Sequence, residues 1–246
     1  TLLGNVGGLQ MAQNKQTVLN NVVARERSIV KSVYLWMSAG LGVTGVVAFF
    51  LASNPSLMRA LIGNGMGLLL VVIGEFALVF YLSSRLEQMS QSSAIGAFLA
   101  YSALTGVMLS TIFTVYTGAL IYKTFLTTAL MFAGMSIYAM GTKRDLSGMG
   151  YYLSMALWGL IIASLVNFLF RSSGFDYILS FLGVGIFLGL TAYDTQRIVR
   201  MNDQYGSSMD EDTFTKMSII GALSLYLNFL NIFLFLLRIF GRSNNN

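Results

Sequence analysis

Long apolar runs are the feature that most constrains the fold of this chain. A helix needs roughly 20 predominantly apolar residues to cross the hydrocarbon core of a bilayer. Seven such runs follow one another along the 246-residue sequence. They predict an all-α membrane protein with spans at 32–52, 66–83, 93–116, 120–140, 150–170, 177–196 and 217–240.

The composition supports this class. The chain is 55% hydrophobic and only 10% charged, whereas a soluble protein carries about 25% charged residues. The runs are too long, and too rich in Leu, Met and Ala, to be the alternating strands of a membrane β-barrel. A soluble domain and a barrel are therefore both excluded.

Two residue types are missing, which restricts the chemistry. The chain has no Cys and no His, so disulfides, thiolate metal sites and the usual base of hydrolytic triads are ruled out. No nucleophile–base set is present, and no cofactor is expected. The acidic stretch 210–212 lacks the spacing of a calcium loop and is interpreted as a solvated loop or as a helix start. The net charge is +5. The basic residues that produce it lie between the spans and do not form a stripe that would bind nucleic acid.

Basic residues predict the topology. With a cytoplasmic N-terminus, ten Lys and Arg residues fall on the inner side and five on the outer side, which is the bias expected for cytoplasmic segments. A six-span chain with a re-entrant last segment is the alternative, because Arg238 and Arg242 would favour the inner face. The predicted organisation is a cytosolic segment 1–30, a membrane domain 31–241 and a tail 242–246. The first ten residues are native or vector-derived and are given no weight.

A few polar residues lie at membrane depth, where a charge costs about 2.5–3.5 kcal/mol on insertion scales. Glu75 is either a neutral acid bonded to a neighbouring helix or part of an ion path. Asp194 pairs with Arg197 on its own helix, is a simple interfacial carboxylate, or has a functional role. Asn228 and Asn231 share one helix face and can join helices. Likewise, the glycine pair in "GIFLG" (185–189) is read as close packing within a monomer rather than as a dimer face.

Two segments resemble signatures of a known family. "GLTAYDTQRI" (189–198) and "LSLYLNFLNIFLFLLRIFG" (223–241) are similar to the sixth- and seventh-helix signatures of the transmembrane Bax inhibitor motif family, also called the Bax inhibitor-1 family. Their order, the short polar loop between them and the Glu in "IGEFAL" (73–78) fit its prokaryotic branch. The resemblance covers roughly 25–246.

The resemblance implies a fold and a function. It implies six helices around a central seventh, and a pH-sensitive calcium leak in a bacterial inner membrane. It implies that the sixth-helix aspartate, Asp194, is a pH sensor, that Arg85 in "SSRLEQ" bridges to the sensor as a latch, and that Glu75 belongs to the ion path. Calcium is then the transported ion, with Asp194 and Glu75 as candidate contacts.

The chain departs from the family pattern at one sensor position. Asn228 in "LYLNF" stands where the pattern has a second aspartate. Two close carboxylates share a proton because both cannot ionise cheaply, and one carboxylate beside an amide lacks that coupling. Asn228 is expected to donate a hydrogen bond to Asp194, and an Asp194–Arg85 latch is expected to open only at more acidic pH. One fewer carboxylate also weakens the expectation of calcium as the ion.

Another class of function remains open at this stage. The chain is alternatively a membrane regulatory protein, such as a modulator of a membrane protease. The polar segment 13–31 then either docks the partner or, as the favoured interpretation, is a flexible anchor that follows the positive-inside rule. The expected partners are membrane lipid, a cation and, in this alternative, the protease, with a monomer favoured.

Overall fold

The computed structural model describes residues 28–205 and 209–243. Within these residues, seven helices are long and apolar enough to cross a membrane. They are α2 (Ile29–Ala52), α4 (Gly65–Arg85), α5 (Gln91–Leu109), α7 (Gly118–Gly141), α8 (Ser147–Phe170), α9 (Ser173–Tyr205) and α10 (Glu211–Ser243). The predicted all-α class and span number are thus confirmed. The segments 1–27 and 244–246, which hold most of the predicted N-terminal segment and tail, lie outside the described residues.

Short elements join some of these helices. The helix α3 (Pro55–Ile62) follows α2, and η1 (Leu86–Gln88) follows α4. After α5 comes α6 (Ile112–Val115), which extends the third apolar segment to Val115. Pro55 occupies the first turn of α3, where its missing N–H leaves no hydrogen bond unmade.

Polar residues set where several helices begin. The side chain of Ser28 accepts a hydrogen bond from the backbone N–H of Lys31 at the start of α2. Asn64, Ser90 and Thr117 cap α4, α5 and α7 in the same way. Such caps satisfy backbone donors that have no partner within the helix. The starts of these four spans are therefore set by local sequence signals.

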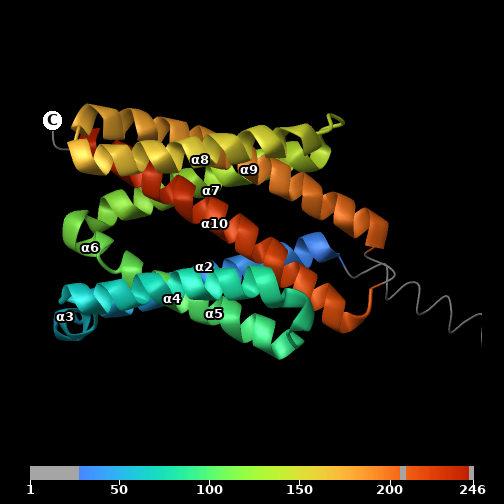
Figure 1. Cartoon of the computed structure of the whole chain (residues 1–246), viewed down its shortest axis with the longest axis horizontal. Coiled ribbons are helices and arrows are strands. Elements are labelled where there is room, and N and C mark those ends of the chain that lie inside the picture. Colours follow the sequence, from blue (N-terminus) through green and yellow to red (C-terminus); the bar gives the residue numbers. More distant parts are fainter. Residues whose placement is uncertain (1–27, 206–208, 244–246) are drawn as a thin grey trace, which may run out of the picture.

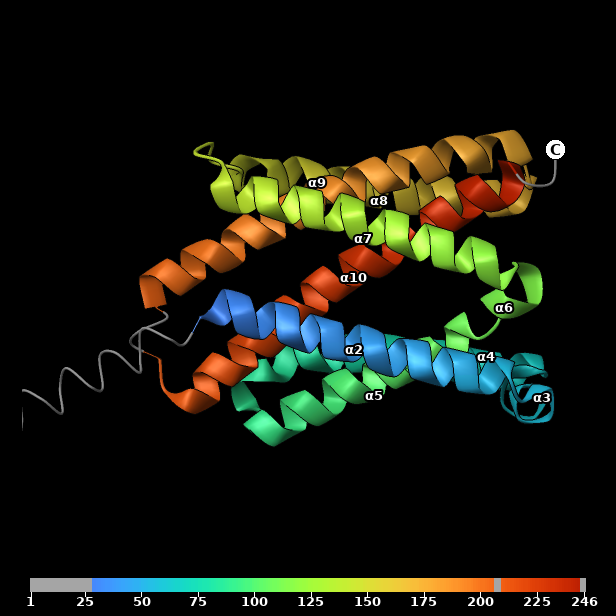
Figure 2. The same cartoon turned by 180° about the vertical axis from the view of Figure 1, so that it is seen from behind.

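The helices form two layers with α10 between them. On one side lie α2, α4 and α5, and on the other lie α7, α8 and α9 (Figure 1). The reverse view shows α10 running diagonally between the layers (Figure 2). It packs against α2, α5, α7 and α9, and it is the most buried of the spans. The predicted central C-terminal helix is confirmed, and its continuity over Glu211–Ser243 does not fit a re-entrant segment.

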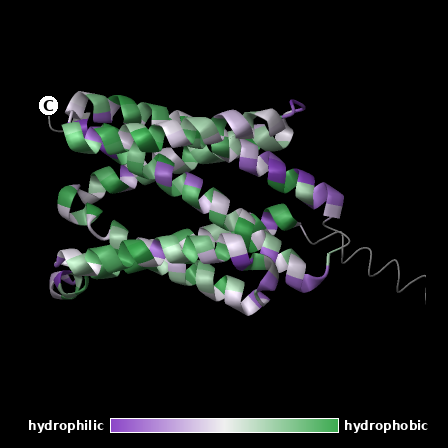
Figure 3. Ribbon diagram, in the orientation of Figure 1, coloured by the Kyte–Doolittle hydropathy of each residue, from purple (hydrophilic) through white to green (hydrophobic). Residues whose placement is uncertain are grey.

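The outer helices expose apolar side chains. On α4 and α8, side chains such as Phe76, Phe80 and Phe168 are about three-quarters exposed. Hydrophilic residues gather instead at the helix ends, most clearly where α9 ends and α10 begins (Figure 3). This pattern is expected when lipid surrounds the bundle, because a lipid-facing surface needs no polar cover.

The two ends of the bundle differ in content. One end holds α3, α6 and the C-terminal end of α10, and the other holds the α7–α8 loop and the end of α9 (Figure 1). The second end carries the segments that were predicted to be cytoplasmic from their Lys and Arg content. The assignment of that end to the cytoplasm stays a prediction.

Candidate functional site

Asp194 and Asn228 meet where α9 lies against α10. The Asn228 Nδ2 donates a hydrogen bond of 2.7 Å to the Asp194 Oδ2, as the sequence predicted. Asp194 lies 21 residues after the start of α9, which is roughly 31 Å along a helix. That length matches a hydrocarbon core of roughly 30 Å. We therefore expect Asp194 near the membrane boundary opposite to the start of α9, and its depth in the membrane stays a prediction.

The pair lines a cavity of about 660 Å³ between α8, α9 and α10. Most of the lining is apolar, with Leu and Phe side chains from all three helices. Its few polar groups come from all three helices, and they are Ser164, Asp194, Ser224, Asn228 and Asn231. An ionised acid in such surroundings attracts cations, because a low dielectric strengthens its field.

A second polar cluster lies on the other face of α10. Residues 226 and 228 are about 200° apart on a helix, so Tyr226 faces α2 and α5 while Asn228 faces α9. The Thr44 hydroxyl donates to the Ser102 carbonyl at 2.8 Å and lies 2.6 Å from the Tyr226 hydroxyl. Since Thr44 has one proton, Tyr226 donates this bond. The cluster ties α10 to α2 and α5.

Glu75 lies on the side of α10 that carries the Tyr226 cluster, and it does not line the cavity of Asp194. It is half-buried near the middle of α4 and interacts with Thr105 and Tyr101 of α5. It is not among the residues that line the 660 Å³ cavity. The structure therefore places the two membrane carboxylates on opposite sides of α10. The role of Glu75 in an ion path stays a prediction.

Arg85 is not joined to Asp194. Its side chain is exposed at the end of α4 and donates a 3.0 Å hydrogen bond to Gln88. Among the described residues, no ion pair connects Asp194 with Arg85 or with Arg197. The helix α4 packs mainly on α5, in the layer away from α9. The predicted latch contact is therefore absent from this structure, because α10 separates the two layers.

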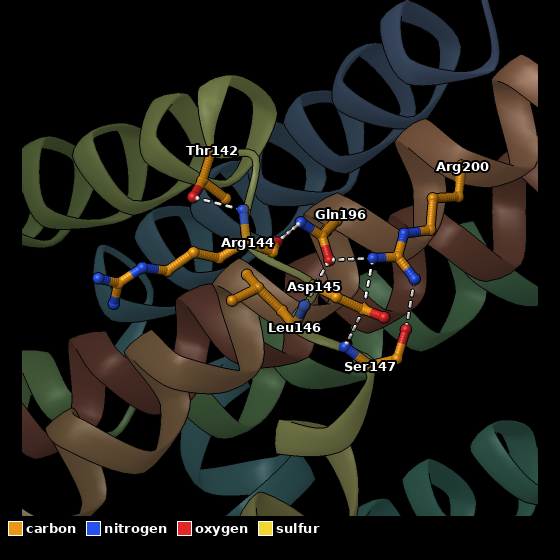
Figure 4. A network of polar contacts seen from close by, with 7 residues as sticks. All are labelled: Thr142, Arg144, Asp145, Leu146, Ser147, Gln196 and Arg200. Carbon is orange, nitrogen blue, oxygen red and sulfur yellow. Dashed lines mark hydrogen bonds and ion pairs between the residues drawn. The ribbon is translucent and has the colours of Figure 1, made fainter.

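The sixth-helix signature also fastens a loop. Gln196 accepts a hydrogen bond from the Leu146 backbone N–H and donates one to the Arg144 carbonyl, both at 2.8 Å. The Arg200 guanidinium forms a 2.5 Å ion pair with Asp145 and also bonds to the Ser147 hydroxyl. These groups converge on the α7–α8 loop in Figure 4. We call this set of residues, Arg144–Ser147 with Gln196 and Arg200, the loop clamp.

The electrostatics of the loop clamp follow from Asp145. Its carboxylate accepts a hydrogen bond from the Ser147 backbone N–H at 2.8 Å and pairs with Arg200. These contacts lower the pKa of Asp145 to about 2, the backbone bond acting most strongly. Asp145 is therefore ionised throughout the neutral and mildly acidic range.

Sequence reasoning did not identify the loop clamp or the Tyr226 cluster. Gln196 and Arg200 are four residues apart, so they lie on one face of the same helix. This spacing is visible in the sequence. Their partners are about 50 residues away in the sequence, and the sequence offered no sign of them. The Thr44–Tyr226 contact joins residues 182 positions apart.

The structure gives a packing role to one glycine of the pair Gly185 and Gly189. A side chain at Gly189 would meet Leu153 of α8 at 2.8 Å, whereas one at Gly185 would meet nothing within 4 Å. Gly189 therefore allows α8 to approach α9 within one chain. The predicted monomer stays a prediction.

Comparison with known proteins gives the family. The family model described as "Inhibitor of apoptosis-promoting Bax1" matches residues 26–245. Inner membrane protein YbhL of Escherichia coli K12 is 46% identical over 215 residues, covering 87% of this chain and 92% of YbhL. An uncharacterized protein of Borreliella burgdorferi is 42% identical over 238 residues, covering 97% of this chain and all of that protein. Both signature segments fall within the family match, so this chain is a multi-pass membrane protein that belongs to the Bax inhibitor-1 family.

Proposed function

We propose that this protein is a proton-sensitive cation leak of a bacterial inner membrane, with calcium as the cation. The observation that carries the proposal is the Asp194–Asn228 hydrogen bond at the wall of a 660 Å³ cavity. The similarity to an inner membrane protein supports the location. The family resemblance supports the ion.

The gating element in this proposal is the contact between α9 and α10. An ionised Asp194 accepts a charge-assisted bond from Asn228, worth about 1.5–3 kcal/mol, whereas a bond between neutral groups is worth about 0.5–1.5 kcal/mol. Protonation of Asp194 therefore weakens the contact between α9 and α10. It also removes the one negative charge that lines the cavity. Acid then favours separation of α9 from α10, and Asn228 replaces Arg85 as the partner that holds the closed state.

Calcium flux into liposomes tests this proposal. The full chain is reconstituted, and flux is followed with an enclosed calcium indicator between about pH 8 and pH 5. We expect low flux at neutral pH and a rise in acid, and we expect Asp194→Asn to remove the pH dependence. The matched control is Asp203→Asn, an exposed acid on the same helix beyond the membrane boundary, which should preserve the pH profile.

Two results would contradict the proposal: flux equal to that of empty liposomes at every pH, and an Asp194→Asn profile that matches that of the unmodified protein. A steep rise centred near neutrality would contradict only the part played by Asn228.

The regulatory alternative has no such observation in its favour. It depends on a docking segment at 13–31, and most of that segment lies outside the described residues. Modulation of a membrane protease therefore remains a secondary hypothesis, tested by co-purification of the full chain with a candidate protease.

A further inference from the structure

The cavity of Asp194 opens sideways between α8 and α10. Within the described part of the chain, α9 is the main packing partner of each of these helices, and α8 and α10 make no comparable contact with each other. On the α8 side of the cavity, the side chains of Leu165 and Phe168 are 63% and 74% exposed. The cavity is therefore a groove that has α9 as its floor and is open to the surroundings of the bundle.

The polar side chains of α9 and α10 gather at one end of this groove. Asp194 and Asn228 are joined by their hydrogen bond, and Asn231 lies three residues further along α10 on the same face. Asp194 is the one ionisable group among the residues that line the cavity. This end of the groove thus carries a single acidic charge beside two amides.

The wall supplied by α8 lies away from the acidic end. Gly150 of α8 is packed against the ring of Tyr193, the neighbour of Asp194 in the sequence. The α8 lining begins at Leu157, which is seven residues, or about 10 Å, further along the helix. Apart from Ser164, the α8 residues of the lining are apolar. The groove therefore has an acidic end and an apolar part.

Three acceptor oxygens at the acidic end have no hydrogen-bond donor among the described residues. The bond between Asn228 and Asp194 uses the Nδ2 of one and the Oδ2 of the other, so the Asp194 Oδ1 and the Asn228 Oδ1 are left over. Asn231 uses its Nδ2 to bond the Leu227 carbonyl, and its Oδ1 is also left over. Since Asn228 is only 4% exposed, a ligand that brings a donor into the groove is favoured there.

A primary ammonium group matches these acceptors. It has one positive charge and three N–H donors, and it has no acceptor. Its charge is opposite to that of ionised Asp194, and its hydrogen bond to a carboxylate is charge-assisted. An alcohol has one donor and no charge, whereas a quaternary ammonium has the charge and no donor. Of these three groups, the primary ammonium alone satisfies both the charge and the acceptors.

We propose that the groove binds a primary ammonium group attached to an apolar body. The ammonium contacts the Asp194 carboxylate and the amide oxygens of Asn228 and Asn231, and the body lies against the apolar wall of α8. The group comes from a free alkylamine dissolved in the bilayer or from the headgroup of phosphatidylethanolamine, and the test separates these sources. The inference rests on the proposed function in one respect, the ionised state of Asp194 at neutral pH.

Equilibrium dialysis of radiolabelled octylamine against the full purified chain tests this proposal. It is done in a neutral detergent at neutral pH, where the amine is charged, with protein-free micelles as the blank. The competitors octyltrimethylammonium and octanol have the same alkyl chain. We expect each to displace octylamine at least about tenfold more weakly than unlabelled octylamine does, the factor that corresponds to one charged hydrogen bond.

Two lipids identify the source of the ammonium. They are phosphatidylethanolamine and phosphatidylcholine with the same acyl chains, each used as a competitor of octylamine. Displacement by phosphatidylethanolamine alone would support the primary ammonium and assign it to a lipid headgroup. Displacement by neither lipid would support a free alkylamine.

Two pairs of variants locate the bound amine. Asp194→Asn and Asn231→Leu should each weaken octylamine binding about tenfold or more. Asp203→Asn on α9 and Asn167→Leu on α8 change the same residue types outside the cavity, and they should leave the affinity unchanged. The unfolding temperature of each variant is measured alongside, so that loss of the fold is told apart from loss of the site.

Three results would overturn the proposal. They are displacement by octanol or octyltrimethylammonium as strong as that by octylamine, equal affinities of Asp194→Asn and Asp203→Asn, and equal displacement by the two lipids. The readout is binding, so it is independent of the leak. Octylamine binding without calcium flux would contradict the leak and leave the amine site standing, whereas flux that needs Asp194 without octylamine binding would do the reverse.

Discussion

The side-chain amide of Asn228 on α10 donates a 2.7 Å hydrogen bond to the carboxylate of Asp194 on α9. This bond joins the central helix to the layer formed by α7, α8 and α9. It also puts an amide where the family pattern has a second carboxylate. The pH response of the protein is therefore expected to depend on a single acid at this position.

Asn228→Asp should move the flux response toward neutral pH. Two adjacent carboxylates share a proton because they cannot both ionise cheaply. The pH of half-maximal calcium flux in liposomes should rise by about one unit or more. Asn228→Leu, which removes the hydrogen bond without adding an acid, should instead raise flux at neutral pH. An unchanged midpoint in Asn228→Asp would show that Asp194 is not the sensor.

Arg85→Gln should leave the flux profile unchanged, because Arg85 bonds to Gln88 and not to Asp194. The comparison is Arg197→Gln, three residues after Asp194 and on the same side of α9. Removal of this nearby positive charge disfavours ionised Asp194, so flux should begin at higher pH. A leak at neutral pH in Arg85→Gln alone would instead support the latch and a different closed state.

Gln196→Ala should destabilise the protein by about 1–3 kcal/mol. The substitution removes three hydrogen bonds, one of them from the Arg200 guanidinium, and leaves the Leu146 N–H and the Arg144 carbonyl without their partner. The measurement is thermal unfolding in detergent. Gln204→Ala, an exposed glutamine two turns further along α9, should have little effect. Equal unfolding temperatures for the two variants would contradict the importance of the loop clamp.

The Asp145–Arg200 ion pair should be insensitive to pH over the range of the flux assay. The pKa of Asp145 is lowered from 3.8 to about 2, so its stabilising contribution is complete above its ordinary pKa and is lost as the pH falls toward 2. Asp145→Asn should therefore lower the unfolding temperature equally at pH 7 and pH 5, and the difference should shrink only in stronger acid. A difference that disappears between pH 7 and pH 5 would contradict this assignment.

Tyr226→Phe should cost about 1 kcal/mol of stability. The Tyr226 hydroxyl donates to Thr44 in the buried interior, and the ring itself is retained by the substitution. Tyr152→Phe on α8, where the side chain is 71% exposed, is the control and should be neutral. A loss no larger than that of the control would show that the contact contributes nothing to holding α2 on α10.

The sequence alone determined the membrane class, the seven spans and the pairing of Asp194 with Asn228. Apolar length and capping residues are local properties of the chain, so they can be read without a structure. The pairing came from the resemblance to the family. The short helix α3 and the extension of α9 beyond its apolar run were missed, because neither an eight-residue helix nor a polar helix end forms an apolar run of span length.

Only the tertiary structure decided which polar groups share a site. It placed Glu75 and Asp194 on opposite sides of α10, left Arg85 away from Asp194, and assembled the loop clamp from distant segments. The physical reason is that the rotation and crossing of each helix follow from side-chain packing against its neighbours. A change of rotation turns a residue from one side of α10 to the other without changing the apolar character of the span.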